Sequence, residues 1–179
     1  MSTARDGDTI ARMTAPRSPL VRADERASLA EHAFSHPLNP KSELRSVALG
    51  DLVGLKRLGV HLVRMAPGKE SFVRHSHYLE EEFIYVLSGR GVVELDDEEH
   101  EVGPGDFLGF PTPSVAHHLR NPFAEELVYL TAGERRDADI AEYPTLGKRV
   151  VRIGTHVAVH ALGSDEGFPG QPLLGEKRK

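Results

Sequence analysis

Two histidines separated by one residue, His75 and His77, are the residues best placed in this chain to begin a metal site. On a β-strand the side chains alternate between faces, so residues i and i+2 point the same way. A carboxylate, Glu82, follows on what reads as the next strand, and a third histidine, His117, follows about one hairpin later. Imidazole and carboxylate groups facing one space are ligands for a transition metal.

Neighbouring residues compete for two of these positions. Glu80 shares a strand face with Glu82, whereas Glu81 lies on the opposite face. Because Glu80 is nearer the turn, Glu82 is the better placed carboxylate. His118 competes with His117, and since adjacent strand residues face opposite sides, only one of them enters the interior. The other is then expected on the outer face.

Other residues near the predicted site are weaker candidates. His61 lies in a strand beside it and either lines the pocket or is a satisfied core histidine. Tyr129 and Thr131 share one face of a late strand and offer hydroxyls to the pocket, although tyrosine in a barrel wall more often serves packing. Arg74 and Arg120 point outward in this strand phase, so we assign neither to substrate.

The charge of an interior carboxylate gives a second reason to expect a cation. A buried, uncompensated carboxylate costs on the order of several kcal/mol, and a divalent ion offsets that cost. Three imidazoles and one carboxylate suit Zn(II), Fe(II), Mn(II), Ni(II) or Cu(II), whereas Ca(II) prefers oxygen ligands. Four protein ligands leave two positions open on a six-coordinate ion but close a tetrahedral zinc. We therefore expect one divalent transition metal as cofactor.

The composition bounds the class of protein. With 179 residues the chain is long enough for one filled core and short of two ordinary domains. Its formal charge of -5 argues against nucleic acid as a partner. There is no cysteine, which excludes disulfides and thiolate metal sites. No apolar run is long enough to span a membrane, and residues 1–20 lack a signal-peptide pattern, so we expect a cytoplasmic protein.

Short stretches of β-forming residues, separated by Gly, Pro, Asp and Ser, make up most of the chain from Glu43 onward. This spacing is typical of an all-β antiparallel sandwich or barrel. We predict an N-terminal arm over residues 1–40 with one short helix within 23–34, a barrel domain over 41–162, and a loose tail over 163–179. The predicted strands are 58–65, 71–77, 82–87, 92–95, 100–102, 106–110, 116–120 and 127–132, with edge strands at 150–153 and 156–161.

Two motifs then identify a family. Residues 68–89 resemble the first cupin motif, a Gly, then His-x-His, a Glu and a Gly, matched by Gly68, His75, His77, Glu82 and Gly89. The gap between Gly68 and His75 is one residue longer than usual. The resemblance spans residues 44–133 and implies a jelly-roll β-barrel with a metal inside.

Residues 105–121 look like the second cupin motif, matched by Gly105, Pro111, His117 and Asn121. Pro113 replaces the usual Gly, and one extra residue precedes His117. The three-residue gap to Asn121 selects His117 over His118 as the ligand. The resemblance thus implies that His75, His77, Glu82 and His117 hold the metal.

Two functions remain open from the sequence. One is a metalloenzyme that chelates a small oxygen-rich substrate, such as a carboxylate, enol or sugar, and acts as an isomerase, decarboxylase, lyase or dioxygenase. The other is a non-catalytic small-molecule-binding cupin with a structural metal. We expect a homodimer, because cyclic pairs dominate soluble oligomers and the face formed by Phe83, Tyr85 and Leu87 needs a cover.

Overall fold

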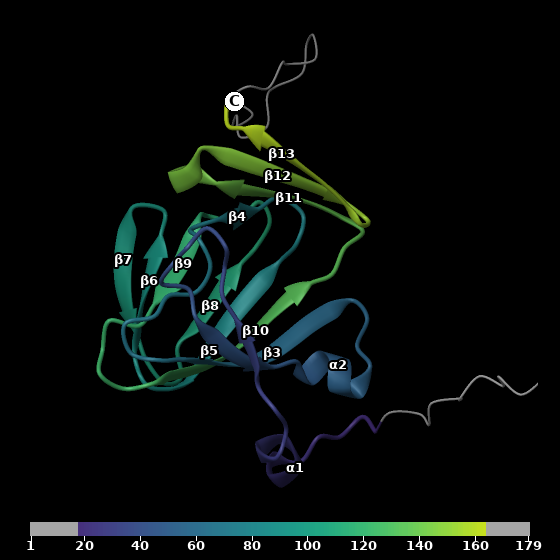
Figure 1. Cartoon of the computed structure of the whole chain (residues 1–179), viewed down its shortest axis with the longest axis vertical. Helices are drawn as coiled ribbons and strands as arrows, with labels where there is room; N and C mark the ends of the chain where they lie inside the picture. The colour runs from purple at the N-terminus through teal and green to yellow at the C-terminus, as the bar shows by residue number, and fades with distance from the viewer. Residues whose placement is uncertain (1–17, 164–179) are drawn as a thin grey trace, which may run out of the picture.

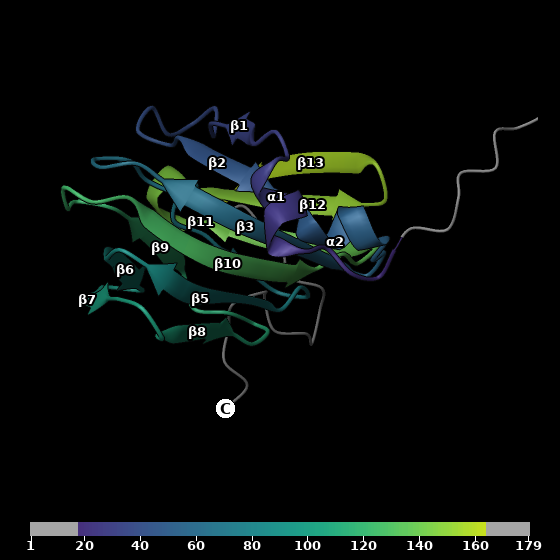
Figure 2. The same cartoon turned by 90° about the horizontal axis from the view of Figure 1, so that it is seen from below.

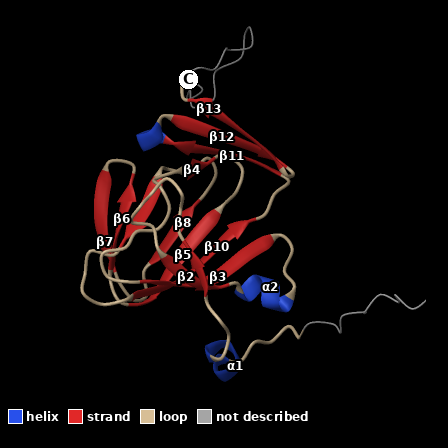
Figure 3. Ribbon diagram, in the orientation of Figure 1, coloured by secondary structure: helices blue, strands red, loops and turns tan. Residues whose placement is uncertain are grey.

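The computed structural model describes residues 18–163, which form three antiparallel sheets with very little helix (Figures 1 and 3). The largest sheet has the order β1-β2-β3-β10-β5-β8. Its strands are β1 (His32–Phe34), β2 (Leu44–Val47), β3 (Leu58–Met65), β10 (Leu127–Glu134), β5 (Glu82–Ser88) and β8 (Phe107–Phe110).

Two smaller sheets complete the fold. One has the order β7-β6-β9, and the other has the order β13-β12-β11-β4. Figure 2 shows the sheets wrapped around a common interior, with α1 and α2 at the outside. The elements are β4 (Ser76–His77), β6 (Gly91–Leu95), β7 (Glu98–Val102), β9 (His117–Arg120), β11 (Ala138–Tyr143), β12 (Lys148–Ile153), β13 (His156–Ala161), α1 (Ala23–Ala27), α2 (Leu49–Val53) and the 3-10 turn η1 (Pro144–Leu146).

The core lies between the large sheet and the β7-β6-β9 sheet. Met65 and Val86 from the large sheet and Val93 and Leu119 from the opposite wall are almost fully buried in one cluster. Each belongs to the inward-facing set of its strand, as side-chain alternation requires. The all-β antiparallel jelly-roll architecture predicted from the sequence is confirmed.

The turn that carries the chain from β5 in the large sheet to β6 in the three-stranded sheet depends on Gly89. Its φ of +74° lies in the left-handed region, and a Cβ there would lie 2.1 Å from the carbonyl oxygen of Glu126. No side chain fits in that space, so a glycine is required at the end of β5. The last glycine of the first motif therefore has a steric role in the strand that begins with Glu82.

The N-terminal arm differs in detail from the prediction. The helix expected within 23–34 covers only Ala23–Ala27, and His32–Phe34 forms β1, which pairs with β2. Phe34 belongs to this strand, and its ring packs against Phe72 at a centroid distance of 5.1 Å. The rest of the predicted arm, residues 1–17, and residues 164–179 of the predicted tail lie outside the described residues.

The strand predicted over 71–77 is also shorter than expected, because β4 covers only Ser76–His77. The residues before it run beside β9 through separate bonds: Ser71 N–H donates to the carbonyl oxygen of Leu119, and His75 N–H donates to that of His117. Strands β1, β2 and β11 were not predicted. Over the described residues, the helices are all too short and polar to be membrane spans.

Candidate metal centre

The four residues singled out by the motifs come from three neighbouring elements. His77 ends β4 and His75 lies just before it, while Glu82 begins β5 and His117 begins β9. The backbones of His75 and His117 form an antiparallel bridge, with N–H to carbonyl distances of 3.1 and 2.8 Å. This bridge places the start of β9 beside the His-x-His segment.

All three imidazoles are held in the same way, by their Nδ1 atoms. His75 Nδ1 lies 2.7 Å from the carbonyl oxygen of Val73, and His117 Nδ1 lies 3.1 Å from that of Val115. His77 Nδ1 lies 2.6 Å from Oδ2 of Asp139. An Nδ1 that donates to an oxygen leaves Nε2 as the free lone pair. Each ring is therefore prepared to ligate through Nε2.

The Nε2 atoms of His77 and His117 turn toward one carboxylate. Glu82 Oε2 lies 3.3 Å from His117 Nε2 and 3.6 Å from His77 Nε2. Ligand atoms of His75, His77 and Glu82 all lie within 4.8 Å of one another. His117 is not part of that tighter group, although it contacts Glu82 directly. His77 Nε2 is buried without a hydrogen-bond partner, which a bound cation would supply.

The electrostatics of the cluster suit a cation. Burial, with the neighbouring imidazoles of His117 and His77, lowers the pKa of His75 to about 4, so this ring is neutral at pH 7. Burial alone would raise the pKa of Glu82, but its contact with His117 and the charges of the histidines lower it. The site therefore offers a neutral imidazole and an ionised carboxylate, which are the ligating forms.

His77 is tuned differently from His75. Burial acts to lower its pKa, but the hydrogen bond and charge of Asp139 outweigh burial, and the pKa is raised. The pKa of Asp139 is lowered in return, because its bond to His77 outweighs the effect of burial. A carboxylate on the far nitrogen of a histidine fixes the ring and makes it a more basic ligand.

Packing around the cluster fixes the other side chains. Gly133 lies opposite Glu82 in the β10–β5 register, and a Cβ on it would lie 3.1 Å from Oε1 of Glu82. The Phe110 ring stacks on His117 with centroids 3.8 Å apart and planes 14° from parallel. Gly133 on β10 thus leaves space for Glu82, and Phe110 on β8 orients the ring of His117.

The cluster borders a small interior cavity of about 50 Å³. A water needs roughly 10–15 Å³ of such space, so the cavity has room for a few waters or the end of a small ligand. Most of its wall is apolar, with Phe72, Ile84, Val93, Phe110, Leu119 and Tyr129 beside Ser71, His75, Glu82, His117 and His118.

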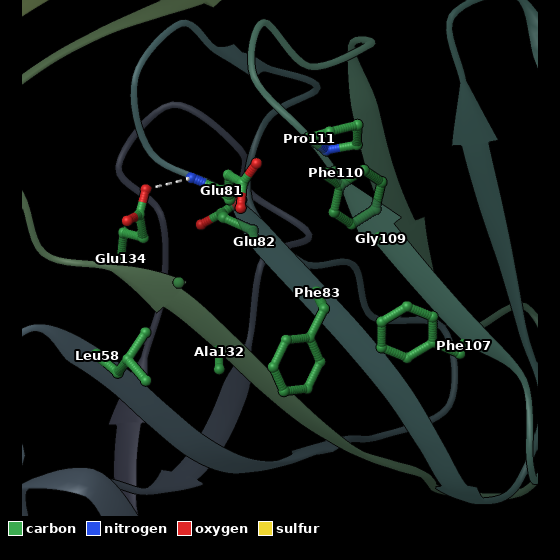
Figure 4. A pocket seen from close by; sticks show the side chains of 11 residues that line it. Leu58, Glu81, Glu82, Phe83, Phe107, Gly109, Phe110, Pro111, Ala132 and Glu134 are labelled. Carbon is green, nitrogen blue, oxygen red and sulfur yellow. Dashed lines mark hydrogen bonds between the residues drawn. The ribbon is translucent and has the colours of Figure 1, made fainter.

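A larger groove of about 360 Å³ adjoins the cavity and shares Glu82 and Phe110 with it. One end of the groove is acidic and the other is aromatic. Figure 4 shows the carboxylates of Glu81, Glu82 and Glu134 at one end, and the rings of Phe83 and Phe107 at the other. Glu81 N–H donates to Oε2 of Glu134 at 3.2 Å. No Arg or Lys lines the groove among the described residues, so its acidic end disfavours an anionic ligand.

A second cluster of residues near the site could also bind a cation, but its carboxylate Glu80 already has partners within the protein. His77, Glu80 and Asp139 also have ligand atoms within 4.8 Å of one another. However, Oε1 of Glu80 accepts hydrogen bonds from Arg152 Nη2 and from the backbone N–H of Arg136, both at 2.6 Å. Glu80 therefore has a cationic partner, and Glu82 is the carboxylate that faces the imidazoles.

The weaker pocket candidates take different positions. Tyr129 lines the cavity and belongs to the buried core. Thr131 and His61 lie opposite each other on β10 and β3 and are not part of the cavity wall. The Thr131 hydroxyl donates to the carbonyl oxygen of Phe83 at 3.1 Å, so that group is occupied by the backbone.

His118 takes the face opposite to His117, as expected, but the protein covers that face. Its side chain does point away from His117, because it lies on the same face as its β6 partner Glu94. Yet it is only 9% exposed, since Glu70 and Glu94 cover it, each with an oxygen 3.6 Å from a ring nitrogen. The burial of His118 thus depends on a loop carboxylate, which alternation within the strand does not reveal.

Two residues at the site were missed in the sequence, Asp139 and Tyr143 on β11. The Tyr143 ring stacks on His75 with centroids 5.9 Å apart, and burial together with the charges of Asp139 and Glu82 raises its pKa. The segment 138–143 alternates only weakly in polarity, so no strand was predicted there. Asp139 and Tyr143 are four residues apart and would share one face of a strand, and this spacing was the one feature of the sequence that pointed to them.

Comparisons with known proteins agree with this geometry. The family model described as "Cupin domain" matches residues 61–133. A solved structure from Acidithiobacillus ferrooxidans, described as a sugar phosphate isomerase, is 37% identical with a TM-score of 0.82, covering 85% of this chain and 97% of its own. A sugar phosphate isomerase of the cupin superfamily from Silicibacter pomeroyi is 29% identical with a TM-score of 0.67, covering 79% of this chain and 92% of its own.

Curated relatives match over shorter stretches. The uncharacterised protein MJ1618 of Methanocaldococcus jannaschii is 45% identical over 47 residues, which is 26% of this chain. The chain spans 37% and 44% of the lengths of the two curated relatives that it matches. The solved structure with 37% identity, in contrast, is covered almost end to end. Together with the two motifs and the barrel, these matches show that the chain belongs to the cupin superfamily.

Proposed function

We propose that His75, His77, Glu82 and His117 hold one divalent transition metal, with Zn(II), Fe(II), Mn(II) or Ni(II) as the expected ions. The observation that supports this most strongly is that all three rings are held at Nδ1, which leaves each Nε2 free to ligate, with those of His77 and His117 beside Glu82. The buried, unpartnered Nε2 of His77 supports it independently. Such an ion, when bound, supplies Lewis-acid polarisation of substrate oxygens.

We further propose that the protein is a metal-dependent isomerase of a small sugar derivative. The support is the likeness to two solved proteins described as sugar phosphate isomerases, at 37% and 29% identity. The cavity of about 50 Å³ admits only the reacting end of a sugar. The rest of the substrate, including any phosphate, therefore lies outside the cavity and away from the carboxylates of Glu81 and Glu134.

The residues of this chain have distinct parts in that proposal. Asp139 orients His77 and keeps its Nε2 available. Phe110 and Phe72 line the cavity and limit the water beside the reacting end of the substrate. Glu82 remains ionised, because the imidazoles beside it lower its pKa. Each of these effects acts on binding and orientation, which brings the substrate oxygens into one fixed geometry.

The test is turnover that depends on metal and on the site. Chelator-treated protein is reloaded with each candidate ion and incubated with a panel of tetrose, pentose, hexose and heptose phosphates, and ketose formation is followed by NMR. We expect one ion to restore turnover, and His77→Ala to remove it. Full turnover by metal-free protein, or by His77→Ala, would contradict the proposal.

One observation favours a second function, ligand binding without turnover. Apart from the proposed ligands, the titratable groups lining the cavity are His118, whose ring points away from His117, and Tyr129, whose pKa burial raises. A general base is thus not evident in the cavity wall. If sugar phosphates raise the melting temperature of the metal-loaded protein and none is converted, this function replaces the isomerase.

A further inference from the structure

Strand β11 places a tyrosine beside the candidate metal centre. In the β11–β4 register Ala141 lies opposite His77 and Glu142 lies opposite Ser76. One further step along the antiparallel pair brings Tyr143 toward His75, and their rings are stacked, 5.9 Å apart and 24° from parallel. Because side chains alternate, Tyr143 shares the strand face of Asp139, which contacts His77. This face of β11 therefore borders the histidine pair at two points.

The Tyr143 ring belongs to an aromatic rim around His75. His36, from the segment joining β1 to β2, lies 6.2 Å from the Tyr143 ring and 6.1 Å from Phe72. Phe72 in turn lies 6.0 Å from His75 and lines the cavity. Figure 1 shows the joining segment rising from α1 to the level of β4 before it returns to β2. The rim thus borders the cavity on the side of the N-terminal segment.

Within this rim Tyr143 carries a hydroxyl that the protein does not use. His36 Nδ1 accepts a hydrogen bond from the backbone N–H of Leu38 at 3.2 Å. The hydroxyl of Tyr78, in contrast, donates a hydrogen bond to Oε1 of Glu142 at 3.2 Å, on the opposite face of β11 from Tyr143. The hydroxyl of Tyr143 forms no hydrogen bond with any residue of the described part of the chain. The oxygen is not among the buried side-chain atoms without a partner, so it is open to water or to a ligand. The charges of Asp139 and Glu82 act on the phenol, which places it on the side of the candidate metal centre.

We infer that Tyr143 donates a hydrogen bond to an oxygen of the small molecule bound at the candidate metal centre. The inference rests on the proposed function and adds to it a ligand-contacting group outside the four metal-binding residues. The ligand it selects has an acceptor oxygen beside the chelating atoms, as a carboxylate, an enolate or a sugar hydroxyl provides. A hydrogen bond to a charged oxygen is among the stronger ones in proteins.

The experiment compares wild type with Tyr143→Phe, which keeps the stacked ring and removes the hydroxyl. Both proteins are loaded with Ni(II), a candidate ion that takes six ligands and so keeps two positions open, and are titrated with oxalate, which offers acceptor oxygens, and with imidazole, whose second nitrogen is a donor. We expect oxalate to bind Tyr143→Phe about tenfold more weakly or worse, with nickel content, melting temperature and imidazole affinity unchanged. Tyr85→Phe is the matched control, because its hydroxyl is on an exposed residue of the outer face.

The possible results separate the two proposals. Equal oxalate affinity in Tyr143→Phe and wild type would overturn the role of Tyr143 and leave the metal site standing. Parallel losses for oxalate and imidazole, or a loss of nickel, would show that Tyr143 only supports the structure and would also overturn it. A wild-type protein that takes up no Ni(II), or that takes it up and rejects oxalate, would overturn the open metal site and the inference with it.

Discussion

Oδ2 of Asp139 lies 2.6 Å from Nδ1 of His77, while Oδ1 of the same carboxylate accepts the backbone N–H of Leu79 at 3.1 Å. The carboxylate is thus fixed at both oxygens, and it fixes the ring in turn. Asp139 lies on β11, outside the residues 61–133 that match the family model. The candidate metal centre is therefore oriented by a strand beyond the region that identifies the family.

Replacing Asp139 with Asn tests this relationship. The amide keeps a similar shape but loses the charge, so His77 becomes a weaker and less firmly oriented ligand. We expect metal affinity to fall roughly ten- to hundredfold, measured by competition with a chromophoric chelator at pH 7.5. Asp137→Asn, at an exposed position two residues away, is the control and should bind as wild type does. Equal affinities in both variants would show that Asp139 has no such role.

Replacing Gly133 with Ala tests the space left for Glu82. The added Cβ would lie 3.1 Å from Oε1 and 3.2 Å from Cγ of Glu82, so the carboxylate must move by a few tenths of an ångström. Since metal geometry is sensitive to such shifts, we expect metal affinity to drop severalfold while thermal unfolding changes little. Gly103→Ala, where the nearest atom lies 3.9 Å away, should leave metal affinity unaltered. Wild-type affinity in Gly133→Ala would mean that Glu82 is not held against this strand.

The lowered pKa of His75 predicts how the metal-free protein responds to acid. In the folded state the ring protonates near pH 4, whereas in the unfolded chain it protonates near 6.5. Between these values the unfolded state binds more protons, so the free energy of unfolding falls as the pH drops from 6.5 to 4. The contribution of this ring is at most about 1.4 kcal/mol per pH unit.

Urea unfolding of metal-free wild type and His75→Gln across this pH range isolates that contribution. The other titrating groups, including His118 with its lowered pKa, are present in both proteins. We expect a shallower pH dependence in the variant. Parallel curves would indicate that His75 is protonated in the folded protein at pH 6, and it would then be a poor ligand.

The outer face of β5 and β8 predicts self-association. Tyr85, Leu87 and Phe107 are 40%, 41% and 65% exposed, a large apolar area for a strand face. We propose that a second copy covers it, and expect light scattering at micromolar concentration to give twice the chain mass of 19.7 kDa. Leu87→Glu should shift the species toward one chain, whereas Glu99→Lys on β7 should not. A wild-type protein at the mass of one chain would refute the dimer.

Much of the barrel could be predicted from the sequence because many of its strands bury apolar residues and are separated by turn residues. The segment 58–65 is apolar at nearly every position, and β3 has the same bounds. Side-chain alternation also selected Glu82 over Glu81, and in the structure Glu82 faces the imidazoles. The strand bounds could be predicted because they depend on periodicity within one strand, and the choice of Glu82 as a metal ligand stays a prediction.

The remaining features depend on contacts between distant segments. β11 was missed because its apolar and polar residues alternate only weakly. Two of its residues are polar and contact other segments instead: Asp139 contacts His77, and Glu142 contacts Tyr78. His118 is buried by Glu70, a loop residue that no pattern within β9 reveals. Strand periodicity therefore locates the residues proposed to bind metal, whereas the residues that orient and cover them require the tertiary structure.

The most direct test is elemental analysis of the protein purified without a metal-affinity tag. The arrangement of His75, His77, Glu82 and His117 predicts close to one equivalent of a single divalent transition metal per chain, and at least a tenfold reduction in His77→Ala. Wild-type protein with no bound transition metal after exposure to all the candidate ions, or His77→Ala with full occupancy, would contradict the metal centre.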